Sequence, residues 1–117
     1  MGKRVLVVDD DPSIRDILSA ALEDDGYEVV PASNGADALD VVDRWKPDVI
    51  VLDLMMPVMD GWTFARRLRE RDDIPIIVIS AANDLARHAL DVGARDVLPK
   101  PFDLDKLLPS VARAATA

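Results

Sequence analysis

Cysteine is absent from this chain of 117 residues, and so are long apolar runs. Without cysteine there is no disulfide framework and no thiolate chemistry, which is compatible with a reducing compartment. No stretch approaches the ~20 apolar residues that a membrane-spanning helix needs. The basic N-terminal residues are not followed by the apolar segment of a secretory signal. We therefore expect no membrane association and no secretion.

Positive charge is scarce. The chain has 14 lysines and arginines against 22 acidic residues, which gives a net charge of −8. Such a surface repels phosphate backbones, so we expect no direct binding of nucleic acid by this chain. The length suits one domain spanning residues 1–117. A domain of this size buries roughly two thirds of its unfolded surface and needs no disulfide or metal to fold.

Apolar runs rich in valine and isoleucine alternate with helical patterns. The expected strands are residues 4–8, 48–53, 74–80 and 95–99, with a weaker edge strand at 27–33. The expected helices are residues 12–25, 35–45, 61–71 and 84–92, and one that begins after Asp103. Strand followed by helix, five times, predicts an α/β fold: a doubly wound, five-stranded parallel sheet with helices on both faces.

Three details of the helices can be predicted from single residues. Asp11 precedes Pro12 and is expected to cap the first helix, and Asn83 is expected to cap the fourth. Pro109 lies beyond the first turn of the fifth helix, which predicts a kink or a delayed helix start. His88, the only histidine, is expected to be a solvated residue on the outer face of the fourth helix.

Polar residues follow the apolar strands at the point where each strand ends. Asp9 and Asp10 end the first strand, Asp53 ends the third, Ser80 ends the fourth and Lys100 follows the fifth. In a doubly wound fold these ends can converge on one rim, where functional sites lie. Taken singly, each of these aspartates is most simply interpreted as an ordinary turn or loop residue. Together the three carboxylates form an oxygen-rich cluster that suits Mg2+.

The first loop, "DDDPS", contains no glycine. A nucleotide or flavin site on this fold needs a glycine-rich first loop whose amides hold phosphate. Three carboxylates would instead repel a bare phosphate. The sequence therefore favours a cation site over a mononucleotide or flavin site.

Four segments together resemble the receiver domain of two-component response regulators. They are "VLVVDDDPSIRDIL", "VIVLDLMMPVMDG", "IIVISA" and "LPKPF". The match covers nearly the whole chain and keeps order and spacing. The resemblance implies a flavodoxin-like (βα)5 fold with strand order 2-1-3-4-5. It also implies a cytoplasmic phosphoprotein of a two-component system or phosphorelay. Residues 1–117 would form one receiver domain, which is either a stand-alone protein or the N-terminal domain of a longer regulator.

The resemblance also implies residue roles. Asp53 corresponds to the aspartate that accepts a phosphoryl group from a sensor histidine kinase, a phosphotransfer protein or a small phosphodonor. Asp9 and Asp10 correspond to the acidic pair that holds Mg2+ with Asp53, and the backbone carbonyl of Met55 would complete the protein ligands. An aspartyl phosphate forms by nucleophilic attack of the carboxylate, a step that depends on positioning and charge neutralisation.

Ser80 and Lys100 correspond to the residues that contact the phosphoryl group, and the resemblance implies a cis bond between Lys100 and Pro101. Movement of Ser80 towards the phosphoryl group would alter the face formed by residues 84–92, 95–99 and the fifth helix. In the family this face binds an output domain or partner protein. Position 97, often aromatic in the family, is valine here, so the rotating-ring part of the switch is not expected.

Met55 and Ala82 stand two residues after Asp53 and Ser80, at positions that influence loss of the phosphoryl group in the family. Neither side chain can position a water by a strong hydrogen bond. We therefore expect slow self-dephosphorylation, and no enzyme activity on an external substrate.

Two alternatives remain open. One is a Mg2+-dependent phosphohydrolase with an aspartate nucleophile, for which Asp9-Asp10-Asp11 supplies an Asp-x-Asp pattern. The capping role expected for Asp11 competes with that reading, and no residues remain for a substrate-selecting cap domain. The other is a receiver-like interaction module that is never phosphorylated, against which the near-complete set of acids, serine and lysine argues.

Overall fold

The computed structural model describes residues 2–81 and 83–116. Strands and helices alternate through them in the predicted order. The strands are β1 (Arg4–Val8), β2 (Glu28–Ala32), β3 (Val49–Asp53), β4 (Ile76–Ser80) and β5 (Asp96–Pro99). The helices are α1 (Pro12–Asp24), α2 (Gly35–Trp45), α3 (Gly61–Arg69), α4 (Leu85–Val92) and α5 (Leu104–Thr116). The predicted α/β fold is therefore confirmed, with strand boundaries that differ by one or two residues.

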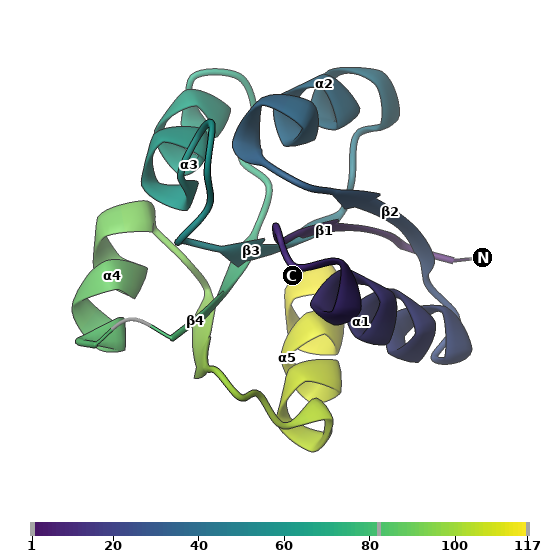
Figure 1. The fold of residues 1–117 in the computed structure, drawn as a ribbon. Coiled ribbons are helices and arrows are strands. Elements are labelled where there is room, and N and C mark those ends of the chain that lie inside the picture. The colour runs from purple at the N-terminus through teal and green to yellow at the C-terminus, as the bar shows by residue number, and fades with distance from the viewer. Residues whose placement is uncertain (1, 82, 117) are drawn as a thin grey trace.

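All paired strands are parallel, and their order is β2-β1-β3-β4-β5. This is the order that the resemblance implied. β2 lies at one edge of the sheet, as predicted, and tolerates Pro31 in its middle. The helices form one layer on each side of the sheet (Figure 1), with α1 and α5 on one face and α2 and α3 on the other.

The central strands are buried on both faces, which explains their continuous apolar sequence. Alternate residues of each strand point to opposite layers. In β1, Leu6 and Val8 join the core under α2 and α3, while Val5 and Val7 join the core under α1 and α5. This alternation extends past the strand ends and decides which side of the rim each polar residue faces.

The predicted cap of α4 is wrong, and so is a delayed start of α5; the alternative for α5, a kink at Pro109, stays a prediction. α4 is capped by Asp84 rather than Asn83; Asp84 has a left-handed backbone (φ 60°) and makes no side-chain capping bond in the described residues. α5 begins at Leu104 and continues through Pro109, so its start is not delayed. Pro109 and Asp105, one turn earlier, are both exposed. Water can therefore satisfy the carbonyl that the proline leaves without a backbone donor.

Within the described part of the chain, every helix is too short or too polar to cross a membrane.

Candidate functional site

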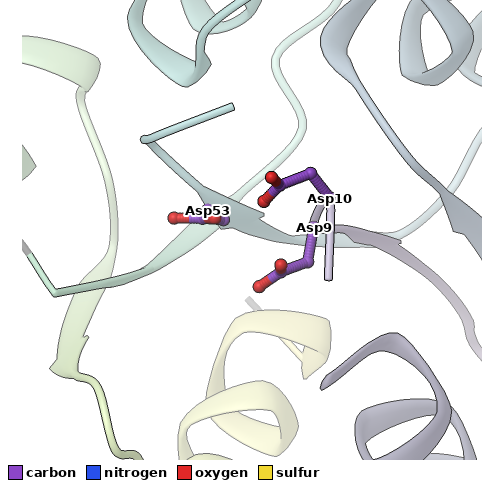
Figure 2. Close-up of side chains that lie close together, drawn as sticks. All are labelled: Asp9, Asp10 and Asp53. Atoms are coloured by element: carbon purple, nitrogen blue, oxygen red, sulfur yellow. The ribbon is translucent and has the colours of Figure 1, made fainter. Parts of the chain in front are cut away.

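Three carboxylates gather where β1 and β3 end (Figure 2). Asp9, Asp10 and Asp53 each offer an oxygen within 4.8 Å of the others. Asp9 and Asp53 are buried, whereas Asp10 is exposed. The predicted convergence of these acids on one rim is confirmed. A group of like charges that is largely shielded from water is unfavourable by itself, so the cluster needs positive charge close by.

The three consecutive aspartates after β1 have different surroundings. The backbone N–H of Asp9 donates to the carbonyl of Ala32 at 3.1 Å, which extends the pairing with β2 by one residue. The Asp9 Oδ1 atom accepts from the N–H of Asp11 at 2.9 Å and so tightens the turn. The Asp11 side chain accepts from the N–H of Ser13 at 2.9 Å and caps α1, as predicted. Only Asp10 is left exposed with its carboxylate unpaired among the described residues.

Asp53 is the last residue of β3 and lies almost wholly out of water. Its Oδ1 atom accepts from the N–H of Met55 at 3.2 Å, and its Oδ2 atom accepts from the Lys100 ammonium at 3.2 Å. Burial and the nearby charge of Asp9 raise the pKa of Asp53, and Lys100 and the Met55 N–H oppose that rise. The carboxylate is thus held in place while its charge is only partly compensated.

Lys100 supplies the positive charge in the cluster. Its Nζ atom lies 2.9 Å from Asp9 Oδ2 and 3.2 Å from Asp53 Oδ2, and the side chain is 17% exposed. Burial lowers the pKa of this ammonium, but the hydrogen bond to Asp9 and the charges of Asp53 and Asp9 outweigh it, and the net shift is upward. Lys100 therefore stays protonated between the two buried acids.

Ser80 is brought beside this cluster by the sheet. It follows Ile79, the residue that pairs with Asp53, and it is fully buried at the end of β4. The carbonyl of Ser80 accepts from the N–H of Lys100 at 2.9 Å, which ties the end of β4 to the residue after β5. The Lys100–Pro101 bond is cis, as the resemblance implied.

Ala82, predicted to influence phosphoryl lifetime, lies outside the described residues.

The donor set of the cluster fits a hard divalent cation. The cluster offers carboxylate oxygens, the ligand type that Mg2+ prefers, and its three acids exceed the single ammonium among them. Met55 is tied to the cluster through its N–H, which donates to Asp53 Oδ1 at 3.2 Å. Asp10 is the exposed member of the cluster, so the cluster is open to water on its side.

The loop between β3 and α3 is packed tightly under the site. Gly61 donates its N–H to the Leu54 carbonyl at 3.0 Å. A Cβ atom at position 61 would lie 2.8 Å from the carbonyl oxygen of Asp53 and 2.7 Å from the Cα of Leu54. Only glycine allows this approach, so Gly61 helps to fix the backbone that carries Asp53.

Sequence reasoning missed one contact at the site. The Arg15 guanidinium donates to the backbone carbonyl of Asp9 at 2.6 Å. Arg15 lies one turn after Asp11 on α1, and helical side chains lean towards the helix N-terminus. That spacing is the signal that could have placed Arg15 over the first loop.

The prediction that His88 is a solvated surface residue is wrong. His88 is half-buried rather than solvated, and its ring lies edge-to-face on Trp62 with centroids 5.1 Å apart. The contact joins α4 to the start of α3, and the packing of these two helices could not be read from the sequence. His88 lies outside the acidic cluster.

A groove of about 320 Å³ borders the site on the side of α1 and the loop before α5. Its lining is mostly apolar: Ile14, Ile17, Lys100, Pro101, Phe102 and Leu104. Ile17 is 52% exposed. Lys100 thus contacts the acidic cluster and also lines an open apolar surface.

The sequence matches the family model of the response regulator receiver domain over residues 5–112. Among curated proteins, it is 46% identical over 111 residues to the response regulator MprA of Mycobacterium sp. (strain KMS) and to that of Mycobacterium tuberculosis (strain ATCC 25177 / H37Ra). Each match covers 92% of this chain and 48% of the relative. The chain therefore spans about half the length of these curated relatives.

Solved structures agree with the sequence matches. The Francisella response regulator 1452 receiver domain has a TM-score of 0.91 and 33% identity, covering 98% of both chains. The chemotaxis response regulator CheY4 of Vibrio cholerae has a TM-score of 0.89 and 35% identity, covering 97% of this chain and 99% of the other. The receiver domain of the sensor histidine kinase PA1611 from Pseudomonas aeruginosa, solved with a magnesium ion in its active site cleft, has a TM-score of 0.90 and 30% identity over the full length of both.

Proposed function

Since this chain belongs to the response regulator receiver domain family of two-component systems, we propose that it is a phosphorylation-controlled switch with Asp53 as phosphoacceptor. The observation that carries the proposal is the placement of Asp53. Its buried carboxylate lies at hydrogen-bond distance from Lys100 and within 4.8 Å of an oxygen of Asp9 and of Asp10. The phosphodonor is a histidine kinase, a phosphotransfer protein or a small phosphodonor.

In the transfer step, a carboxylate oxygen of Asp53 forms a bond to the donor phosphorus. The bond from phosphorus to the donor nitrogen or oxygen breaks, and the donor keeps the electron pair. The Met55 N–H and Lys100 hold the carboxylate in position for this attack. The Lys100 ammonium also offers a positive charge to the arriving phosphoryl oxygens.

Asp9, Asp10, Asp53 and the Met55 carbonyl would hold Mg2+. The excess of carboxylates over ammonium groups supports this assignment, as does the magnesium ion in the PA1611 receiver domain. When bound, the ion offsets the repulsion between an anionic nucleophile and an anionic donor. Asp10, exposed and unpaired in the described structure, is the ligand most accessible to an arriving ion.

The phosphorylated state is read by Ser80 and Lys100. A phosphoryl group on Asp53 adds negative charge and acceptor oxygens beside both residues. Because the Lys100 N–H is bonded to the Ser80 carbonyl, a shift at either residue is transmitted to the exits of β4 and β5. The responding surface is the α4-β5-α5 face, which would contact an output domain or partner protein.

The phosphodonor protein would dock beside Lys100. The apolar groove between α1 and the loop before α5 supports this, because a protein seated there lies next to the acidic cluster. The proposal places the domain in the cytoplasm, with self-phosphorylation and slow self-dephosphorylation as its only reactions. We propose that residues 1–117 form a single receiver domain.

The test is the intact mass of the protein after incubation with acetyl phosphate and Mg2+. We expect one added phosphoryl group, no addition when the metal is chelated, and no addition for Asp53→Asn under any condition. Asp91→Asn is the matched control, since Asp91 is an exposed acid on α4 outside the cluster. An adduct on the Asp53→Asn protein would refute the assignment of the phosphoacceptor. If the parent protein takes up no phosphoryl group, this proposal fails.

A further inference from the structure

Arg15 makes a contact that neither the acceptor chemistry nor the proposed metal ligands account for. It is half-buried, and its guanidinium donates to the Asp9 carbonyl at 2.6 Å. Within residues 2–81 and 83–116, Arg15 forms no ion pair with any carboxylate. An arginine in an acidic domain thus directs its side chain at a backbone oxygen.

The oxygen that it holds belongs to the peptide unit joining Asp9 to Asp10. β1 ends at Val8, so this carbonyl lies beyond the regular strand pairing. A peptide unit is planar, and fixing its carbonyl fixes the direction in which the next Cα atom leaves. The Arg15 bond therefore sets the relative direction of the Asp9 and Asp10 side chains, two of the three acids in the cluster.

Other contacts hold Asp9 and the peptide that follows Asp10. The Asp9 N–H is bonded to Ala32, and the Asp9 carboxylate is bonded to Asp11 and paired with Lys100. The Asp10 side chain has no partner among the described residues. Two peptide units flank Asp10: the Asp10–Asp11 peptide is held by the Asp9 carboxylate, and the Asp9–Asp10 peptide is held by Arg15 from the first turn of α1.

We propose that Arg15 is a positioning residue for the cation site, which it serves by holding the Asp9–Asp10 peptide so that both carboxylates face one ion. This inference rests on the proposed function, because it needs the cluster to bind Mg2+. Arg15 itself contacts neither the ion nor the phosphoryl group in this account.

The charge of Arg15 and its hydrogen bond have opposite effects on Mg2+ binding, and this makes the proposal testable. The positive charge of Arg15 repels a cation, so removing the charge alone would tighten Mg2+ binding. Loss of the hydrogen bond frees the peptide and would weaken binding. Arg15 lines an open groove of about 430 Å³ between α1 and α2, so water screens its charge. We therefore expect loss of the Arg15 hydrogen bond to change Mg2+ affinity more than loss of the Arg15 charge does.

The experiment measures the Mg2+ dissociation constant by calorimetric titration of the parent, Arg15→Met, Arg15→Lys and Arg44→Met proteins. We expect Arg15→Met to weaken binding by about tenfold, the lower end of the effect of losing a group that orients a metal ligand. Arg15→Lys keeps a donor and should fall between the parent and Arg15→Met. Arg44 lines the same groove without contacting Asp9, so Arg44→Met loses the same charge and should bind as the parent does.

The free energy of unfolding of each protein, measured in chelator, shows whether weaker Mg2+ binding arises from lost positioning or from a general loss of stability. If Arg15→Met binds Mg2+ as tightly as the parent or more tightly, the proposal is wrong, whatever happens to stability. If Arg15→Met does not fold, Arg15→Gln takes its place, since it removes the charge and is too short to keep the bond to Asp9; an affinity equal to that of the parent overturns the proposal equally. A parent protein that binds no Mg2+ refutes the metal site itself, an outcome distinguishable from failure of Arg15 alone.

Discussion

The two ends of the sheet carry charged residues in opposite ways. At the amino end, the Arg4 guanidinium lies 3.9 Å from the Glu28 carboxylate and 5.4 Å from the Trp45 ring centroid, with both charged side chains largely exposed. At the carboxyl end, Asp9 and Asp53 are buried and share one ammonium. Charges at the amino end are balanced and solvated, whereas those at the carboxyl end are crowded, acidic and withdrawn from water.

The exposed charges at the amino end matter little to stability, whereas the buried charges at the carboxyl end belong to the candidate site. Exposed ion pairs contribute about 0–1 kcal/mol and leave a fold nearly indifferent to their loss. Buried like charges oppose folding and persist where a function needs them. The raised pKa of Asp53 is the local sign of that opposition. Substitutions at each end should therefore change the free energy of unfolding by very different amounts.

The largest effect is expected for Lys100→Ala. Removing the ammonium leaves Asp9 and Asp53 buried together without a cation. Breaking a buried pair in this way costs about 3 kcal/mol of unfolding free energy at neutral pH in chelator. Denaturant unfolding with and without Mg2+ measures it, and the ion should recover part of the loss. A Lys100→Ala protein as stable as the parent in chelator would show that the cluster is not under electrostatic stress.

A smaller effect of opposite sign is expected for Asp53→Asn. Burial and Asp9 raise the pKa of Asp53 in the folded state, so the folded protein binds that proton more tightly than the unfolded chain does. The parent therefore loses stability as the pH rises from near the ordinary value of 3.8 through the raised pKa. Asparagine does not titrate. In chelator at neutral pH, Asp53→Asn should be more stable by about 1 kcal/mol, and the difference should vanish in acid.

Saturating Mg2+ supplies the control for that experiment. The ion should stabilise the parent by about 2.7 kcal/mol at a concentration 100 times its dissociation constant, and the Asp53→Asn protein by less. Equal stability of parent and variant in chelator across the whole pH range would contradict the assigned cause of the pKa shift.

The smallest effect is expected at the amino end. Glu28→Gln removes the 3.9 Å ion pair with Arg4 but keeps the size of the side chain. The free energy of unfolding should change by less than about 0.5 kcal/mol, measured by the same denaturant method. A loss comparable to that of Lys100→Ala would erase the proposed contrast between the two ends.

Most of the fold could be predicted because its strands are buried on both faces. Runs such as residues 49–52 are apolar throughout, and helical patterns separate them, so element order follows from the sequence. The order of strands in the sheet does not follow from such patterns and came only with the family resemblance. The cap of α4 was misplaced by one residue because Asp84 adopts a left-handed backbone that side-chain chemistry does not signal.

The placement of the site residues could likewise be predicted from the sequence only in part. Asp9, Asp53 and Lys100 could be brought together from sequence, because parallel strands present their carboxyl ends at one edge. Arg15 and the His88–Trp62 contact could not, since each depends on how a helix packs against a neighbouring element. The chemical roles of Asp9, Asp10, Asp53, Met55, Ser80 and Lys100 stay predictions that the geometry supports.

The most direct measurement locates the phosphoryl group on the chain. The protein would be treated with acetyl phosphate and Mg2+, reduced with borohydride to convert an aspartyl phosphate into homoserine, and sequenced as peptides by mass spectrometry. The account predicts homoserine at position 53 alone, absent when Mg2+ is chelated. Homoserine at position 9 or 10, or at 53 with equal yield in chelator, would contradict it.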